Sequence, residues 1–168
     1  MKNPIFAVAY AIMWIIPVSF IVINGKKYDE RQLLARNTAF KAAFITLITY
    51  CFGCGIINCL DIVWADLPIQ MFLGALISIT FFSAYCIIMD AYFISTKKRK
   101  WNFITYHLST AVLSTLSVLI DAGRGEALWS SDGLSPLALK IAFSASFFVI
   151  GIISLVKTVS DRKVTKLI

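Results

Sequence analysis

Charged residues are scarce in this chain of 168 residues: they make up 15% of it, whereas soluble domains average about 25%. There are four cysteines and one histidine, too few for a disulfide scaffold, and no Cys and His residues have metal-ligand spacing. The sequence also lacks a glycine-rich phosphate loop, an H-E-x-x-H motif and a G-x-S-x-G motif. We therefore expect no catalysis, no cofactor and no metal site.

Hydrophobic residues, by contrast, make up 59% of the chain, and the mean hydropathy is +0.81. They are concentrated in five nearly uncharged stretches of about 20 residues, each long enough to cross about 30 Å of hydrocarbon as a helix. Helices are expected because a lipid-embedded backbone must satisfy its own hydrogen bonds. The sequence predicts an all-α integral membrane protein, a single domain over residues 1–168 that forms a bundle of five transmembrane helices in the lipid bilayer. The spans are residues 4–23, 42–60, 68–89, 101–120 and 137–156.

Basic residues follow alternate spans, and this pattern predicts the direction of insertion. Lys and Arg in short loops stay preferentially in the cytoplasm. Twelve of them lie in the segments after the first, third and fifth spans, against Lys2 and Arg124 in the other segments. We therefore expect an N-terminus outside and a C-terminus in the cytoplasm. The net charge of +7 then belongs to the inner membrane face, so we do not expect a nucleic-acid partner. The twelve are Lys26, Lys27, Arg31, Arg36, Lys97, Lys98, Arg99, Lys100, Lys157, Arg162, Lys163 and Lys166.

The segment before the second span has the signals of a helix start. Asp29 is a suitable N-cap, and Gln32 three residues later completes the pattern of a capping box. A helix over residues 30–60 would be about 46 Å long, longer than the hydrocarbon is thick. Its first turns are either an interfacial cap for the second span or a docking surface for a cytosolic partner. The candidate docking residues are Asp29, Glu30, Arg31 and Gln32.

Three short sequences carry a family resemblance: Tyr28-Asp29-Glu30-Arg31-Gln32, Ala39-Phe40-Lys41 and Asp90-Ala91-Tyr92. Together they resemble uncharacterised small multi-spanning membrane proteins of Gram-positive bacteria with an Asp-Glu-Arg-Gln motif, which are often encoded beside helix-turn-helix regulators. The resemblance implies a bacterial cytoplasmic membrane and a role in regulation or protection. It implies no catalytic residue.

Three ionisable side chains lie in or at the spans, where charge is costly and often functional. Lys41 begins the second span, Asp90 ends the third, and His107 lies one to two turns into the fourth. All three are expected at a similar depth near the cytoplasmic side. Asp90 and Lys41 are predicted to form an ion pair that sets helix register, with His107 hydrogen-bonded to either. A proton relay would use the same residues.

Cys51 and Cys54 form a C-x-x-C sequence in the second span. A membrane thiol oxidoreductase would use such a pair. An apolar span, however, disfavours the thiolate that this chemistry needs, and a second cysteine pair at the membrane surface is missing. We therefore interpret both cysteines as small, buried packing residues.

The fourth span is rich in hydroxyl residues, which let helices approach and hydrogen-bond. We expect it at the centre of the bundle, with Thr110, Ser114 and Ser117 on one face. Carboxylates gather on the outer side and offer a weaker candidate for binding a cation: Asp61, Asp66, Asp121, Glu126 and Asp132.

Because polar residues cluster near the two surfaces, the sequence favours a small regulatory, accessory or immunity-like membrane protein that acts through protein contacts. A carrier or channel subunit for a small solute or ion is the alternative, and a thiol oxidoreductase is third.

Overall fold

The computed structural model describes residues 28–92, 97–130 and 133–165. Four helices account for most of this part of the chain, and all four are long and apolar enough to cross a membrane. This confirms the all-α class, and the four helices overlap the second to fifth predicted spans. The predicted first span, residues 4–23, lies outside the described residues. The helices are α2 (Glu30–Cys59), α3 (Leu67–Ile88), α4 (Lys97–Gly123) and α5 (Pro136–Thr165).

The capping signals before the second span form α2 as the sequence predicts. The carboxylate of Asp29 accepts a hydrogen bond from the Gln32 backbone N–H at 2.7 Å, and the Gln32 side chain accepts one from the Asp29 N–H at 3.4 Å. Together these bonds satisfy two N–H groups that a bare helix end leaves unpaired. With 30 residues, α2 is about 45 Å long.

An aspartate in the left-handed backbone region follows both α2 and α3. Asp61 has φ 56° and Asp90 has φ 55°. In each case the next N–H reaches back to a carbonyl of the last helical turn, from Ile62 to Ile57 at 3.3 Å and from Ala91 to Cys86 at 2.8 Å. This termination usually employs glycine, because a side chain at positive φ is strained. Aspartate tolerates the conformation better than most residues.

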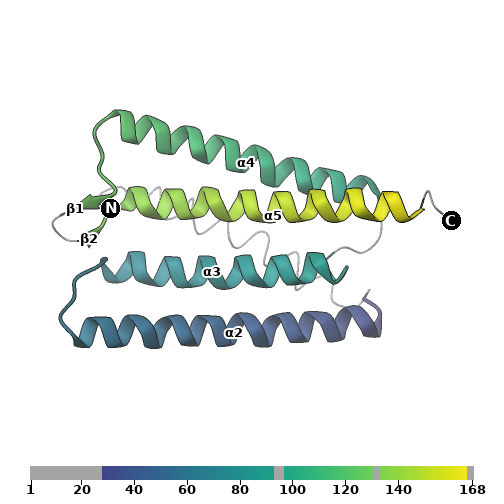
Figure 1. The fold of residues 1–168 in the computed structure, drawn as a ribbon, viewed down its shortest axis with the longest axis horizontal. Coiled ribbons are helices and arrows are strands. Elements are labelled where there is room, and N and C mark those ends of the chain that lie inside the picture. The colour runs from purple at the N-terminus through teal and green to yellow at the C-terminus, as the bar shows by residue number, and fades with distance from the viewer. Residues whose placement is uncertain (1–27, 93–96, 131–132, 166–168) are drawn as a thin grey trace.

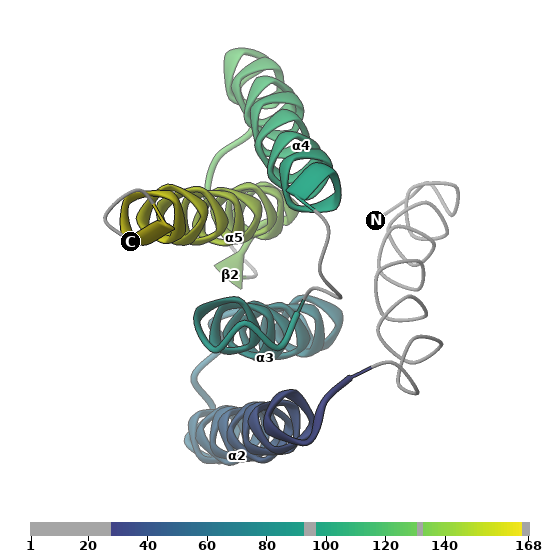
Figure 2. The same ribbon diagram turned by 90° about the vertical axis from the view of Figure 1, so that its right-hand side faces the viewer.

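The four helices form an open row in the order α2, α3, α5, α4, with each helix antiparallel to the next along the chain (Figure 1). Seen from the end, α2 and α4 lie at opposite edges of this row (Figure 2). Among the four described helices, α4 packs chiefly on α5 at one edge, which differs from the central place expected for the fourth span. Hydroxyl residues are compatible with either place, since they need one neighbouring helix and not several.

Close contacts join each pair of neighbours in the row. Gly74 of α3 faces the Tyr50 ring of α2, where a Cβ would come within 2.6 Å of a ring carbon. Gly151 of α5 leaves room for Leu108 of α4, whose side chain would lie 2.7 Å from a Cβ. Two buried clusters fill the remaining space: Ala39, Phe82, Cys86 and Ala91 between α2 and α3, and Leu76, Ala111, Phe143 and Phe147 among α3, α4 and α5.

A small β hairpin closes the end of the row at which α4 stops. Its strands are β1 (Trp129–Ser130) and β2 (Gly133–Leu134), which pair antiparallel. The Leu134 N–H donates to the Trp64 carbonyl at 2.8 Å, so the hairpin is bound to the loop between α2 and α3. Gly133, at φ +100°, lies so close to the Trp64 backbone that a Cβ on Gly133 would be 2.5 Å from the Trp64 carbonyl carbon. Only glycine fits both constraints.

Candidate functional site

The antiparallel order brings the basic segments of the chain to one end of the row, which we call the basic end. Here α2 and α4 begin and α3 and α5 finish (Figure 1). The sequence at this end includes Arg31 and Arg36 in α2, the run 97–100 in α4, and Lys157 in α5. The opposite end, the acidic end, carries Asp61, Asp66, Asp121 and Glu126. The charge asymmetry read from the sequence is therefore also an asymmetry of the fold.

Asp90 connects three helices at the basic end. Its carboxylate Oδ2 lies 2.9 Å from Nζ of Lys157 on α5, and its backbone carbonyl accepts a hydrogen bond from Nε2 of Gln32 on α2 at 2.9 Å. Lys157 also lies 3.5 Å from Asp161, one turn further along α5. Asp90 thus joins the helices on both sides of α3.

The same contact brings together two of the three short sequences on which the expected resemblance rests. Gln32 closes the Asp-Glu-Arg-Gln sequence, and Asp90 opens the sequence Asp90-Ala91-Tyr92. Gln32 has two roles, since its Oε1 accepts the capping bond and its Nε2 donates to Asp90. The other candidate docking residues, Asp29, Glu30 and Arg31, are exposed.

Arg36 is the most buried cation at this end whose side chain the structure describes. It is 8% exposed, and its guanidinium carbon lies 4.1 Å from the centre of the Tyr28 ring. This distance suits a cation–π contact, which strengthens when water is excluded. Nearby, burial raises the pKa of the Tyr92 phenol, so this side chain stays neutral. Sequence reasoning counted Arg36 only as a loop charge.

Lys41, Asp90 and His107 do not form the predicted cluster. Asp90 lies level with Gln32, whereas Lys41 is nine residues further along α2, about 13 Å towards the acidic end. Lys41 is exposed, whereas Nζ of Lys157 lies against the Asp90 carboxylate. The predicted pairing of Asp90 with Lys41 is thus corrected to Asp90 with Lys157. The physical reason is that the side chain of Lys41 leaves α2 on the side away from α3.

His107 is buried among aromatic rings of α4 and α5. Its ring centroid lies 3.9 Å from that of Phe103 and 5.3 Å from that of Phe147. Its Nδ1 is 2.9 Å from the Phe103 carbonyl oxygen of its own helix. His107 therefore contributes to the packing of α4 on α5, apart from Lys41 and Asp90.

The cysteines are all free thiols. Cys51 is exposed on α2 and Cys54 is half-buried, without a disulfide between them, so the expected burial of Cys51 is wrong. In the described part of the chain, no group of three or more His, Cys, Asp and Glu side chains is placed to hold a metal ion.

From the sequence we did not predict the polar side-chain pairs that join neighbouring helices at and near the acidic end. Asp121 of α4 is buried and paired with Lys140 of α5, and is therefore withdrawn from the acidic outer surface. Asn58 and Gln70 exchange side-chain hydrogen bonds of 3.1 and 3.3 Å between α2 and α3. A signal existed for these pairs and for Lys157: each member lies near the end of a span, at the same predicted depth as its partner.

Ser144 joins α5 to α4 further from the acidic end, where its hydroxyl donates to the Ala111 carbonyl at 3.1 Å and also contacts Thr115. Thr115 Oγ1 lies 2.6 Å from Ser144 Oγ. Ser117, expected on the contact face, is exposed, whereas Thr115, which is not among the residues expected there, makes the contact.

We compared the chain with known protein families, with curated proteins and with solved structures, and none of them matched.

Proposed function

We propose that this chain is a small regulatory or accessory protein of a bacterial cytoplasmic membrane, of the immunity-like kind, which acts through contacts with another protein. It crosses the membrane five times, with the N-terminus outside and the basic end in the cytoplasm. The principal support is how polar side chains are used within the row. Thr115 with Ser144 and Asn58 with Gln70 each join two neighbouring helices. These polar side chains hydrogen-bond to one another between helices. They do not line the continuous polar path that a carrier requires.

Two further observations support the orientation and the membrane. The basic segments share one end of the row, as expected when Lys and Arg remain in the cytoplasm. The contact of Gln32 with Asp90 joins two sequences shared with the Gram-positive membrane proteins that the chain resembles. That contact ties the start of α2 to the end of α3 at the basic end, next to the exposed residues Asp29, Glu30 and Arg31.

Native mass spectrometry after mild detergent extraction from the chain's own membrane tests the proposed function. We expect a second protein in fixed stoichiometry with the chain, and a weaker complex for the charge reversal Arg31→Glu. The matched control is Asn102→Glu, because Asn102 is also exposed near the basic end. A chain extracted without a second protein would refute the proposal. A small solute retained with the chain would favour the carrier.

Cysteine labelling tests the orientation. In a background without the four native cysteines, an impermeant thiol reagent added to intact cells should label a cysteine at Glu126 and spare one at Glu30. Both positions are exposed, at opposite ends of the row. The reverse pattern would invert the proposed orientation.

A further inference from the structure

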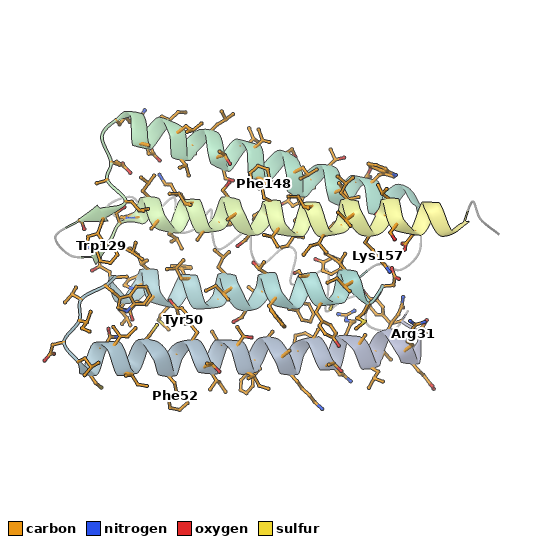
Figure 3. All side chains as sticks on the ribbon, viewed as in Figure 1. Arg31, Tyr50, Phe52, Trp129, Phe148 and Lys157 are labelled. Atoms are coloured by element: carbon orange, nitrogen blue, oxygen red, sulfur yellow. The ribbon has the colours of Figure 1, made fainter. Side chains whose placement is uncertain are left out.

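The helix α2 packs on α3 through one face, and no other residue that the structure describes covers the opposite face. Ala39 and Tyr50 point towards α3. At about 100° per residue, Lys41, Phe52 and Gly55 lie roughly half a turn away from these two residues. Figure 3 shows the Tyr50 side chain between α2 and α3 and the Phe52 side chain directed away from both. Phe52 is 71% exposed.

Two features of this outward face suit a closely packed helix better than lipid chains. Cys51, Gly55 and Cys59 recur at every fourth position and, with the Phe52 ring, line a hollow of about 680 Å³. A Cβ on Gly55 would meet no atom within 4 Å. Glycine inside a helix costs about 1 kcal/mol relative to alanine, and nothing within the described part of the chain requires it here. Small residues at this spacing let a second helix approach closely in a membrane.

Lys41 adds a charge to the same face. It is exposed and makes no hydrogen bond or ion pair with any residue that the structure describes. Its neighbours on the helix are apolar and open, with Phe40 53%, Phe44 62% and Ile45 63% exposed. A lysine among side chains that face the membrane is costly, and a carboxylate on a neighbouring helix is one of the partners that offset this cost. The outward face therefore combines a hollow and an uncompensated cation, about 21 Å apart along α2 between Lys41 and Gly55.

We propose that the outward face of α2 binds a membrane-spanning helix of a different protein, which carries an Asp or Glu at the depth of Lys41. This inference rests on the proposed function and names the class of its partner. The chain's own residues 1–27 cannot supply the charge, because they contain no Asp or Glu. A second copy fits poorly, because a two-fold dimer through this face would place two Lys41 side chains at one depth.

Site-specific photo-crosslinking in the native membrane tests this docking surface. With a benzophenone amino acid at Phe52, we expect one discrete adduct with another protein. The same probe at Leu113 of α4 should not give it, although Leu113 is 67% exposed. Mass spectrometry of the adduct should identify a membrane span with a carboxylate near its cytoplasmic end.

Substitutions then separate this interface from nonspecific proximity. Lys41→Gln should reduce the adduct at least fivefold, and Lys41→Asp combined with a lysine at the partner's carboxylate should restore it. Gly55→Leu fills the hollow and should abolish the adduct. Gly53→Leu is the matched control, because a Cβ there also meets no atom within 4 Å but points to another side of α2. All variants should keep the unfolding midpoint of the parent in detergent.

The outcomes decide between the possible occupants of the face. An adduct at twice the 18.7 kDa of the chain would show a second copy and overturn the inference, and adducts with lipid alone would overturn it as well. If a partner co-purifies on native extraction but is not crosslinked from Phe52, the inference fails and the proposed function stands. If neither experiment finds a partner protein, both fail.

Discussion

The side chain of Lys157 on α5 reaches Asp90 at the end of α3, with Nζ 2.9 Å from Oδ2. At the other end of the same helix, Lys140 pairs with Asp121 of α4. The two lysines are seventeen positions apart, about 25 Å along α5. Each binds an aspartate of a different neighbour, so α5 is held against α3 at the basic end and against α4 near the acidic end. Together the two ion pairs restrict sliding of α5 along its own axis.

The pair at the basic end should contribute modestly to stability. Its side chains are 52% exposed for Asp90 and 30% for Lys157, and exposed ion pairs contribute up to about 1 kcal/mol. In a double-mutant cycle of Asp90→Asn and Lys157→Gln, we expect a coupling of about 0.5 to 1 kcal/mol in the free energy of unfolding in mixed micelles. This coupling should decrease as salt is added.

Asp61→Asn is the matched control for this cycle, because Asp61 also follows a helix at positive φ but makes no ion pair among the described residues. It should show no coupling to Lys157→Gln. Equal coupling at both positions would mean that the cycle reports the backbone conformation of aspartate and not the ion pair.

The pair of Asp121 and Lys140 near the acidic end should contribute more to the free energy of unfolding. The Asp121 side chain is only 10% exposed, so Lys140→Met leaves a largely buried carboxylate with only the more distant Arg124, whose Nη1 lies 3.8 Å from Oδ1. We expect a loss of about 3 kcal/mol, larger than that caused by Lys157→Met, and partial recovery when Asp121→Asn is added. The unfolding free energies of the three variants test this order. Equal losses for the two lysine variants would contradict the assigned difference in burial.

The contact between the hairpin and the α2–α3 loop should depend on Gly133. Gly133→Ala places a Cβ 2.5 Å from the Trp64 carbonyl carbon, in addition to the strain of φ +100°. Gly125→Ala introduces the strain alone, at φ +85° with no atom within 4 Å, which costs about 1 kcal/mol. Thermal unfolding in detergent should therefore show a clearly greater loss for Gly133→Ala. Similar midpoints would show that the Trp64 backbone moves without cost.

The hydroxyl contact between α4 and α5 should be small but measurable. For Thr115→Val with Ser144→Ala we expect a coupling of about 0.6 kcal/mol, the usual size for such bonds between membrane helices. Ser146→Ala is the control, since the Ser146 hydroxyl donates to the Ala142 carbonyl of its own helix at 2.9 Å. Coupling of Thr115→Val to Ser146→Ala would contradict a specific bond to Ser144.

Much of the helical structure could be predicted because its determinants are local. The capping box of Asp29 and Gln32 depends on residues three apart, and it forms as expected. Hydropathy over about 20 residues located α3, α4 and α5, because a lipid-embedded backbone must complete its hydrogen bonds within its own segment. The alternation of charge between loops likewise indicated which helix ends lie together.

Only the tertiary structure decided which helices are neighbours. Hydropathy is the same for a helix at the edge of the row and one inside it, so the edge position of α4 could not be read from its sequence. The rotation of α2 about its axis turns Lys41 away from α3, and the order of the row places Lys157 beside Asp90. The sequence by itself determined that this chain forms long apolar helices with one basic end. Packing between helices determined which charges meet, because an ion pair needs its two side chains at the same depth and on facing sides.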